Sequence, residues 1–259
     1  MSKLMLASAF APVSHLLGRI EPNLKGRTVA FIPTASMKDS TGIFNRMAKW
    51  KLRALGLNVQ EIDVAVASYH DIKTTIASSS MIYVTGGNTF YLLQSLRYSS
   101  ADELIAQAVR EGKTYIGESA GAVVAGPNIE YIKRMDSEDP APYLDNDYAG
   151  LGLVDFSIVP HIDSPALGES AAEIMRHSNG DDHMVPIRDD QRQRWASRVI
   201  DYTAFDPSLF SMEGNACQLK QTSASSAWPQ WAVASHAISH TMATRSPYST
   251  APTPAPKSS

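Results

Sequence analysis

Residues 115–122 read Tyr115-Ile-Gly-Glu-Ser-Ala-Gly-Ala122, and this pattern is typical of an α/β protein. A short apolar strand runs through Gly-x-Ser-x-Gly into small residues that suit a helix. A serine on such a tight turn needs glycine two positions before and two after it, because a Cβ there would clash with neighbouring backbone. The pattern also occurs in ordinary glycine-rich turns, but its place between a strand and a helix favours a nucleophile at Ser119.

Similar short apolar runs recur along the first two thirds of the chain and alternate with amphipathic stretches. Strands are predicted at 3–9, 28–33, 58–63, 81–84, 114–117 and 156–160, and helices at 41–55, 89–96 and 101–111. Strands that alternate with helices connect by right-handed crossovers and form a mostly parallel sheet flanked by helices. Ligands of such sheets bind beyond the carboxyl ends of the strands, so we expect the functional residues there.

The composition narrows the class of protein. The chain has 259 residues, of which 44% are hydrophobic, and a formal net charge of -3, so a real core is expected and a nucleic-acid partner is not. Cys217 is the single cysteine, which excludes an internal disulfide and favours a reducing, cytoplasmic compartment. The start is predicted to be a strand and not a signal peptide, and no apolar run approaches the roughly 18–20 residues that span a membrane.

The composition changes near residue 190. No Asp or Glu occurs from Gly214 to the end, and the stretch from Thr222 is dominated by Ser, Ala, Thr and Pro. We therefore predict a catalytic domain over 1–191 and an atypical C-terminal extension over 192–259 that is largely disordered from about residue 222. A second interpretation is that the segment after Gln191 is not the original ending of the domain, for instance because the reading frame changed.

A second glycine-containing turn, Gly86-Gly-Asn-Thr-Phe90, ends the strand at 81–84 and opens a helix that Asn88 or Thr89 can cap. Glycines let the backbone approach a ligand closely, so the amides of Gly87 and Ala120 are candidates for an oxyanion hole. Gly86 and Asn88 are then expected to lie against the substrate. A phosphate-binding loop is disfavoured because the turn contains no Lys and no G-x-G-x-x-G.

A serine nucleophile needs a base, usually histidine, and a third group that orients the base. Of seven histidines, His161 stands out because it follows the apolar run 156–160, at the mouth of a strand that we expect on the same sheet edge as Ser119. Five carboxylates could orient it, and the residues alone do not rank them: Asp189, Asp190, Asp136, Asp139 and Asp163.

The chain resembles the peptidase E family of serine peptidases, the aspartyl dipeptidases, which are related to cyanophycinases. The resemblance covers roughly residues 3–191 and rests on three ordered motifs, Gly86-Gly-Asn-Thr-Phe90, Gly117-Glu-Ser-Ala-Gly-Ala122 and Val159-Pro-His-Ile-Asp163. It implies a three-layer fold like that of class I glutamine amidotransferase domains (flavodoxin-like). It also implies a Ser–His–acid triad without a metal or other cofactor, with Ser119 as nucleophile and His161 as base.

The resemblance also implies which acid completes the triad. The family's glutamate lies in a turn after the histidine, and Ile187-Arg-Asp-Asp190 takes that place here, which selects Asp189 ahead of Asp190 and Asp136. The family carries a further functional aspartate between the serine and the histidine. Asp136 falls one position from that place and is expected near the substrate.

Two departures from the family concern the substrate. Aspartyl dipeptidases have a Gly-Glu-Thr-Arg stretch whose arginine is expected to pair with the aspartyl side chain, whereas this chain has Gly168-Glu-Ser-Ala171. A small apolar side chain cannot replace a bidentate guanidinium, which argues against a preference for N-terminal Asp. Glu169 could hold a substrate α-ammonium group or be only a favourable first-turn charge. Glu118 replaces the aromatic residue expected beside the nucleophile.

The sequence therefore predicts a cytoplasmic serine hydrolase, monomeric or homodimeric, that cleaves small peptides through an acyl-enzyme without a cofactor, nucleic acid or membrane. An alternative is a catalytically inactive binding or regulatory protein on the same scaffold, because the C-terminus is altered. A weaker alternative is an esterase of the α/β-hydrolase class. Its Ser–acid–His order would require Asp136 or Asp139 as the acid.

Overall fold

The structure, a computed structural model, describes residues 3–36, 42–178 and 183–190, together with the backbone of four later strands that end at residue 219. All described elements belong to one compact unit, Met1–Leu219. The predicted disorder from about residue 222 and the changed reading frame concern residues that lie mainly outside this description.

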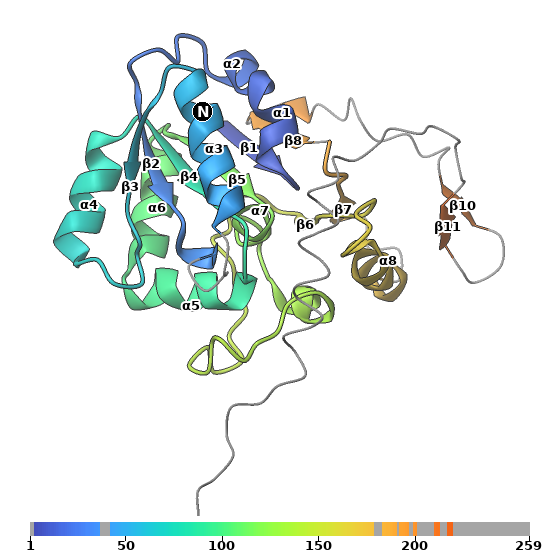
Figure 1. The fold of residues 1–259 in the computed structure, drawn as a ribbon. Coiled ribbons are helices and arrows are strands. Elements are labelled where there is room, and N and C mark those ends of the chain that lie inside the picture. The colour runs from blue at the N-terminus through green and yellow to red at the C-terminus, as the bar shows by residue number, and fades with distance from the viewer. Residues whose placement is uncertain are drawn as a thin grey trace, which may run out of the picture. The chain divides into compact units, whose positions relative to one another are not determined.

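A seven-stranded sheet with the order β3-β2-β4-β5-β1-β8-β9 forms the centre of the molecule (Figure 1). Its strands are β1 (Lys3–Ala7), β2 (Thr28–Ile32), β3 (Asn58–Glu61), β4 (Met81–Val84), β5 (Thr114–Glu118), β8 (Arg192–Ala196) and β9 (Val199–Ile200). The first five are parallel, whereas β8 runs antiparallel to β1 and β9 antiparallel to β8. The predicted mostly parallel sheet is confirmed.

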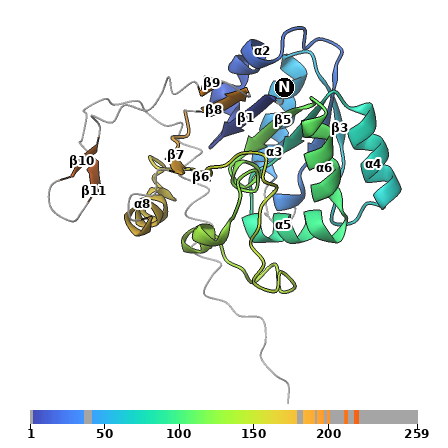
Figure 2. The same ribbon diagram turned by 180° about the vertical axis from the view of Figure 1, so that it is seen from behind.

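The described part of the chain forms eight α-helices. They are α1 (Phe10–Val13), α2 (Leu17–Ile20), α3 (Ile43–Ala54), α4 (Tyr69–Ser78), α5 (Thr89–Tyr98), α6 (Ala101–Arg110), α7 (Ala120–Val123) and α8 (Gly168–His177). Short 3-10 helices cover Ser14–Leu16, Thr34–Ser36 and Glu130–Arg134. Helix α3 lies in front of the sheet in Figure 1, whereas α6 lies in front of it in Figure 2, so the two helices cover opposite faces.

The strands bury alternate side chains in two cores, because successive residues of a strand point to opposite faces. Leu4 and Leu6 of β1 pack in the core that contains residues of α4, α5, α6 and α7. Met5 and Ala7 of the same strand pack in the core that contains residues of α1, α2 and α3. The sheet is therefore the middle of three layers, as the sequence predicts.

Two smaller sheets lie outside the central one. Strand β6 (Ser157–Val159) pairs in parallel with β7 (Met184–Pro186), and β10 (Phe210–Met212) pairs antiparallel with β11 (Cys217–Leu219). The expectation that the strand before His161 shares a sheet with Ser119 is therefore wrong. Strands β8 and β9 follow Gln191 and extend the central sheet past the end predicted for the catalytic domain, a boundary that stays a prediction.

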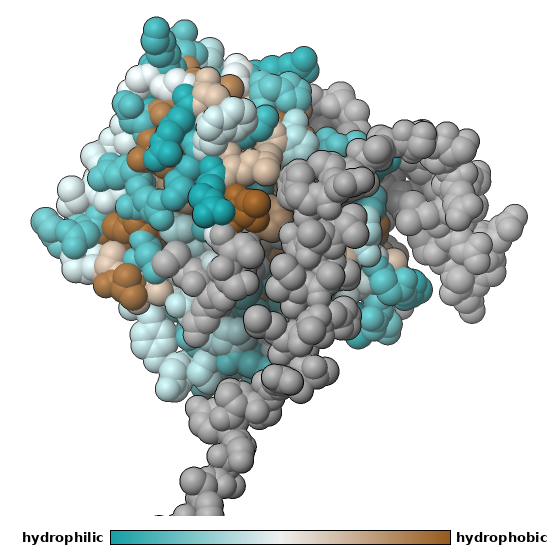
Figure 3. Space-filling model, viewed as in Figure 1, coloured by the Kyte–Doolittle hydropathy of each residue, from teal (hydrophilic) through white to brown (hydrophobic). Residues whose placement is uncertain are grey.

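The surface is mixed in polarity. In Figure 3 apolar side chains form separate small patches among polar ones on the coloured part of this face. Among the residues whose burial the structure describes, the large apolar side chains that are exposed are Phe44, Trp50, Val66, Tyr69, Tyr98 and Tyr143. Within the described residues, no helix is both long and apolar enough to cross a bilayer.

Candidate active site

Ser119 lies on the sharp turn between β5 and α7. Its backbone has φ 47° and ψ −108°, a conformation that residues with a side chain rarely adopt. The backbone N–H of Ser119 donates a hydrogen bond to the carbonyl oxygen of Ala7 on the neighbouring strand β1, at 2.8 Å. Strained backbone of this kind occurs where the surrounding structure holds it, and it presents the serine hydroxyl beyond the end of the sheet.

The glycines of the Gly-x-Ser-x-Gly pattern are required by close backbone contacts. A Cβ on Gly117 would lie 2.4 Å from the carbonyl oxygen of Gly121, and a Cβ on Gly121 would lie 2.3 Å from that of Val84. On the facing turn, a Cβ on Gly86 would lie 3.1 Å from the Cβ of Ser119. The spacing of the motif therefore follows from packing of the turn against β4 and of the two turns against each other.

His161 and Asp189 lie in line with the Ser119 hydroxyl. The Oγ of Ser119 is 2.8 Å from Nε2 of His161, and Nδ1 of the same ring is 2.7 Å from Oδ1 of Asp189. The three side chains come from different segments. Ser119 lies on the turn between β5 and α7, which we call the elbow, His161 follows β6 and Pro160, and Asp189 lies in the turn after β7. The structure thus brings together the three residues predicted as a triad.

The surroundings of Asp189 favour its ionised form, which can accept a hydrogen bond from His161. Burial by itself raises the pKa of this carboxyl, but the hydrogen bond and charge of His161, helped by a hydrogen bond from Ser8, hold the pKa below its ordinary value. The backbone N–H of Asp189 donates to Oδ1 of Asp163 at 3.0 Å. Asp190 instead has a side chain 65% exposed beside Arg188, so of the two candidate acids only Asp189 meets His161.

The predicted oxyanion donors lie on the two turns that meet at the nucleophile. Gly87 has φ 136°, and a Cβ there would lie 2.2 Å from the carbonyl oxygen of Ala35. Ala120 begins α7 directly after Ser119. Among the residues described by the structure, no acceptor is paired with the backbone N–H of Gly87 or Ala120. Both amides can therefore donate to a ligand.

Asn88 serves as the cap of α5. Its side-chain oxygen accepts the N–H of Tyr91 at 2.8 Å, and its side-chain nitrogen donates to the carbonyl oxygen of Ser137, also at 2.8 Å. Each polar atom of the side chain thus has one partner within the protein, and the amide nitrogen keeps a second N–H. The predicted cap is confirmed, and the role of Asn88 against the substrate stays a prediction.

Asp136 is bound to the same turn. Its Oδ2 accepts the N–H of Thr89 at 2.8 Å and the hydroxyl of Thr89 at 2.5 Å. Burial raises the pKa of Asp136, against the effect of the Thr89 hydrogen bonds and of the nearby His161. The carboxyl does not hydrogen-bond His161, so its place is beside the glycine turn and not in line with the triad.

Glu118, next to the nucleophile, makes its hydrogen bonds to residues outside the triad. Its Oε1 accepts the N–H of Phe10 at 2.8 Å, and its Oε2 accepts the hydroxyl of Tyr83 at 2.6 Å. Burial raises the pKa of this carboxyl. The glutamate that replaces an aromatic residue of the family therefore ties β5 to the start of α1.

Glu169 is not brought to the triad. Its side chain is 88% exposed and pairs with Arg176 at 3.0 Å, which agrees with a first-turn charge on α8. Ala171, which stands where the aspartyl dipeptidases have arginine, is fully buried.

Ser8 is a residue of the site that the sequence analysis missed. Its hydroxyl donates to Oδ1 of Asp189 at 2.6 Å and lies 3.0 Å from Nδ1 of His161. Ser8 follows β1 directly, and a polar residue at the carboxyl end of a strand is the signal that could have revealed it.

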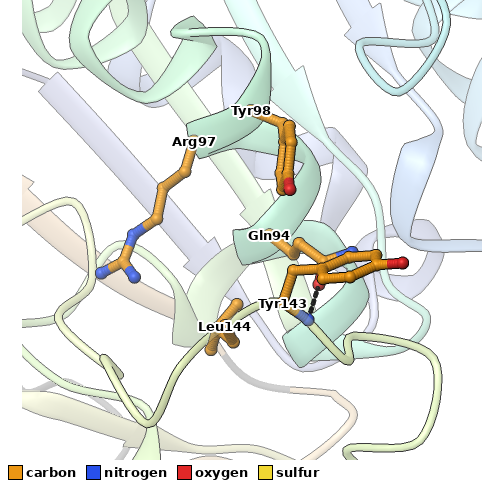
Figure 4. A pocket seen from close by; sticks show the side chains of 5 residues that line it. All are labelled: Gln94, Arg97, Tyr98, Tyr143 and Leu144. Carbon is orange, nitrogen blue, oxygen red and sulfur yellow. Dashed lines mark hydrogen bonds between the residues drawn. The ribbon is translucent and has the colours of Figure 1, made fainter.

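A separate hollow lies between α5 and the loop that contains Tyr143 (Figure 4). Gln94, Arg97 and Tyr98 of α5 line it with Tyr143 and Leu144, and the N–H of Tyr143 donates to the side-chain oxygen of Gln94. None of the predicted site residues contributes to it. Within the described chain, no cluster of side chains suited to a metal ion is found.

A three-layer α/β fold with a serine on a strand-to-helix turn and a histidine within reach is typical of serine hydrolases. Comparison with known proteins is more specific. The model of Peptidase family S51 matches residues 4–197, and the chain belongs to this family of serine peptidases.

Individual relatives agree with the family. An uncharacterized peptidase of Listeria monocytogenes is 45% identical over 187 residues, which are 72% of this chain and 91% of the relative. The peptidase E of Salmonella arizonae is 34% identical over 166 residues, 62% of this chain and 69% of the relative. The resemblance to peptidase E is confirmed, and the esterase alternative is set aside.

A solved structure supports the fold. The crystal structure of a "Putative Peptidase E Protein" from Listeria monocytogenes superimposes with a TM-score of 0.73 at 42% identity, over 77% of this chain and 96% of that chain. The chain is therefore a peptidase with the predicted three-layer fold.

Proposed function

We propose that this peptidase cleaves small peptides by acyl transfer, with Ser119 as nucleophile, His161 as general base and Asp189 as the group that orients His161. The observation that carries the proposal is the unbroken line of contacts from Ser119 Oγ to His161 Nε2 at 2.8 Å and from His161 Nδ1 to Asp189 Oδ1 at 2.7 Å. A nucleophile, its base and an orienting acid within hydrogen-bond distance are the recurring pattern of such catalysis.

The reaction follows from these positions. Ser119 Oγ attacks the scissile carbonyl carbon while its proton passes to His161 Nε2. The negatively charged oxygen of the tetrahedral intermediate accepts hydrogen bonds from the N–H groups of Gly87 and Ala120. The intermediate collapses when the C–N bond breaks and His161 protonates the leaving amine. A water molecule then attacks the carbonyl carbon of the acyl-enzyme while His161 takes its proton. When the ester bond breaks, His161 returns a proton to Ser119 Oγ, which releases the acid and restores the serine.

The substrate proposal is a short peptide without a strict requirement for N-terminal Asp. Ala171 is buried and apolar, so this position supplies no guanidinium to an aspartyl side chain. A panel of dipeptides that differ only in the first residue, Asp included, tests this: comparable hydrolysis of neutral and acidic dipeptides supports it, and a strong preference for Asp opposes it. A cytoplasmic location and a monomeric or homodimeric state stay predictions from the sequence.

The mechanism is tested by labelling with a fluorophosphonate probe and locating the modified peptide by mass spectrometry. We expect stoichiometric labelling at Ser119, lost in Ser119→Ala and reduced at least a hundredfold in rate in His161→Ala. Circular dichroism on each variant shows whether it is folded. A folded wild-type protein that takes up no label would reject the mechanism and favour the inactive binding scaffold.

A further inference from the structure

Ser8 is buried at the point where the base and the acid of the candidate triad meet. Only 1% of this residue is exposed, and it immediately follows β1, the strand between β5 and β8. Its Oγ is 2.6 Å from Oδ1 of Asp189, 3.0 Å from Nδ1 of His161 and 2.8 Å from the backbone N of His161. The Ser8 hydroxyl thus contacts the side chains of His161 and Asp189 and also the backbone of His161.

The three contacts are compatible with the bonding capacity of a hydroxyl. Ser8 has one proton, which it donates to Asp189, and two lone pairs, one of which accepts the backbone N–H of His161. The Nδ1–H of His161 points to Asp189 with Ser8 Oγ beside it. Oδ1 of Asp189 therefore accepts from both Ser8 and the imidazole, which fixes the carboxylate and the ring relative to each other.

We propose that Ser8 is a positioning residue for catalysis, holding His161 and Asp189 in the orientation that proton transfer from Ser119 requires. The inference rests on the proposed function, since it assigns a role relative to that triad. Ser8 does not reach the scissile bond and acts through His161 and Asp189 alone.

The backbone of His161 gives one reason why a positioning group is needed. His161 has φ 65°, in the left-handed region that residues with a Cβ adopt at an energetic cost. Its N–H is bound by Ser8 Oγ, and its carbonyl oxygen accepts the N–H of Ser164 at 3.0 Å. The hydroxyl therefore anchors the strained residue at its N–H as well as at its ring.

The segment that carries Ser8 is itself fixed to the nucleophile elbow. On one side of Ser8, the carbonyl oxygen of Ala7 accepts the N–H of Ser119 at 2.8 Å. On the other side, the N–H of Phe10 donates to Glu118 at 2.8 Å. These two bonds connect the segment to the residues on which the nucleophile sits. Through Ser8, the base is thereby held in register with Ser119, although β6 belongs to another sheet.

The test measures how fast a fluorophosphonate inactivates the full-length protein, with the limiting rate kinact separated from the half-saturating concentration KI. Loss of the Ser8 hydroxyl misaligns the base, and misalignment of catalytic groups costs roughly 10- to 100-fold in rate. We expect Ser8→Ala to lower kinact by that factor and to leave KI within about twofold, because binding of the probe is unaffected.

Ser14→Ala is the matched control. Ser14 is also buried and near the same end of the chain, but its hydroxyl donates to the carbonyl oxygen of Ala11 and hydrogen-bonds none of the described residues of the site. Its kinact should equal that of the wild type. The low-field proton resonance of the His161 Nδ1–H adds a second readout, which should shift or broaden in Ser8→Ala and not in Ser14→Ala.

The outcomes separate the two proposals. If the folded wild type is not labelled at Ser119, the proposed function fails and the role of Ser8 fails with it. If the wild type is labelled and Ser8→Ala reacts at the wild-type kinact, only the role of Ser8 is rejected. Should Ser8→Ala not fold, Ser8→Cys replaces the hydroxyl by a larger, weaker donor. A lowered kinact then supports the inference, and an unchanged one overturns it.

Discussion

Asp189 accepts a hydrogen bond from Nδ1 of His161 at 2.7 Å, while Asp190, the next residue, points its carboxylate toward solvent beside Arg188. The turn after β7 therefore presents two adjacent aspartates in different environments. The side chain of Asp189 is 17% exposed and that of Asp190 is 65% exposed. The same substitution at these two adjacent residues therefore tests which aspartate is the acid of the triad.

Asp189→Asn should nearly abolish the reaction. An asparagine cannot stabilise the imidazolium, and it favours the wrong tautomer of the histidine, a change that costs roughly 10³- to 10⁴-fold in serine-protease triads. Asp190→Asn removes only an exposed ion pair with Arg188 and should change kinact by less than about twofold. Fluorophosphonate inactivation rates of the two variants check this. Equal losses in both would show that Asp189 is not the orienting acid.

Gly121→Ala should both destabilise the protein and slow the labelling of Ser119. The added Cβ would lie 2.3 Å from the carbonyl oxygen of Val84, so the elbow must move. Overpacking of this kind costs about 1–3 kcal/mol, and displacement of the nucleophile should slow inactivation by about a hundredfold. Urea denaturation and inactivation rates measure the two effects.

Gly18→Ala is the control for that substitution. Gly18 lies in α2, and no atom would lie within 4 Å of its added Cβ. Because alanine is favoured over glycine in helices, the free energy of unfolding should stay equal or rise by up to about 1 kcal/mol. A Gly121→Ala protein as stable and as reactive as Gly18→Ala would contradict the packing explanation of the motif.

Much of the fold was predictable because the strands are short and apolar and end in turn residues. The predicted strand at 81–84 has the same bounds as β4, Met81–Val84, and the other predicted strands agree to within a few residues. Helices α1, α2, α4 and α8 were not predicted. The buried positions of α4, Ile72, Thr75 and Ile76, have the i, i+3, i+4 spacing of a helix, but only two of the three are apolar, so the apolar stripe in its sequence is short. The alternation of strands and helices does not show which sheet a strand joins. Strand β6 was expected in the central sheet but pairs with β7 in a separate one.

The candidate site was predictable where it follows local sequence. The elbow is defined by glycines within five residues of one another, and His161 by its place after a strand. Ser8 was missed because it lay inside the predicted strand 3–9 and its contact with His161 spans 153 positions of the chain. The partnership of Asp136 with Thr89 is likewise a long-range contact, which no local pattern indicates.

Substitutions at Asp136 should separate its hydrogen bonds from its charge. Asp136→Ala leaves the N–H and the buried hydroxyl of Thr89 without their acceptor, which costs about 1–3 kcal/mol of stability and should loosen the turn with Gly87. We expect inactivation of Ser119 to slow by about tenfold. Asp136→Asn keeps an acceptor oxygen and should stay within about threefold of the wild type. Asparagine as slow as alanine would mean that the charge near His161 is what matters.

Glu118→Gln should change how stability depends on pH. Burial raises the pKa of Glu118 above its ordinary value of 4.5, so the native state binds this proton more tightly than the unfolded state. The native state therefore loses stability as pH rises from about 4.5 through the raised pKa, and glutamine lacks this loss. Urea denaturation between pH 4 and pH 8 should show the variant gaining on the wild type as pH rises. A difference that is constant over this range would mean that Glu118 has the same pKa in both states.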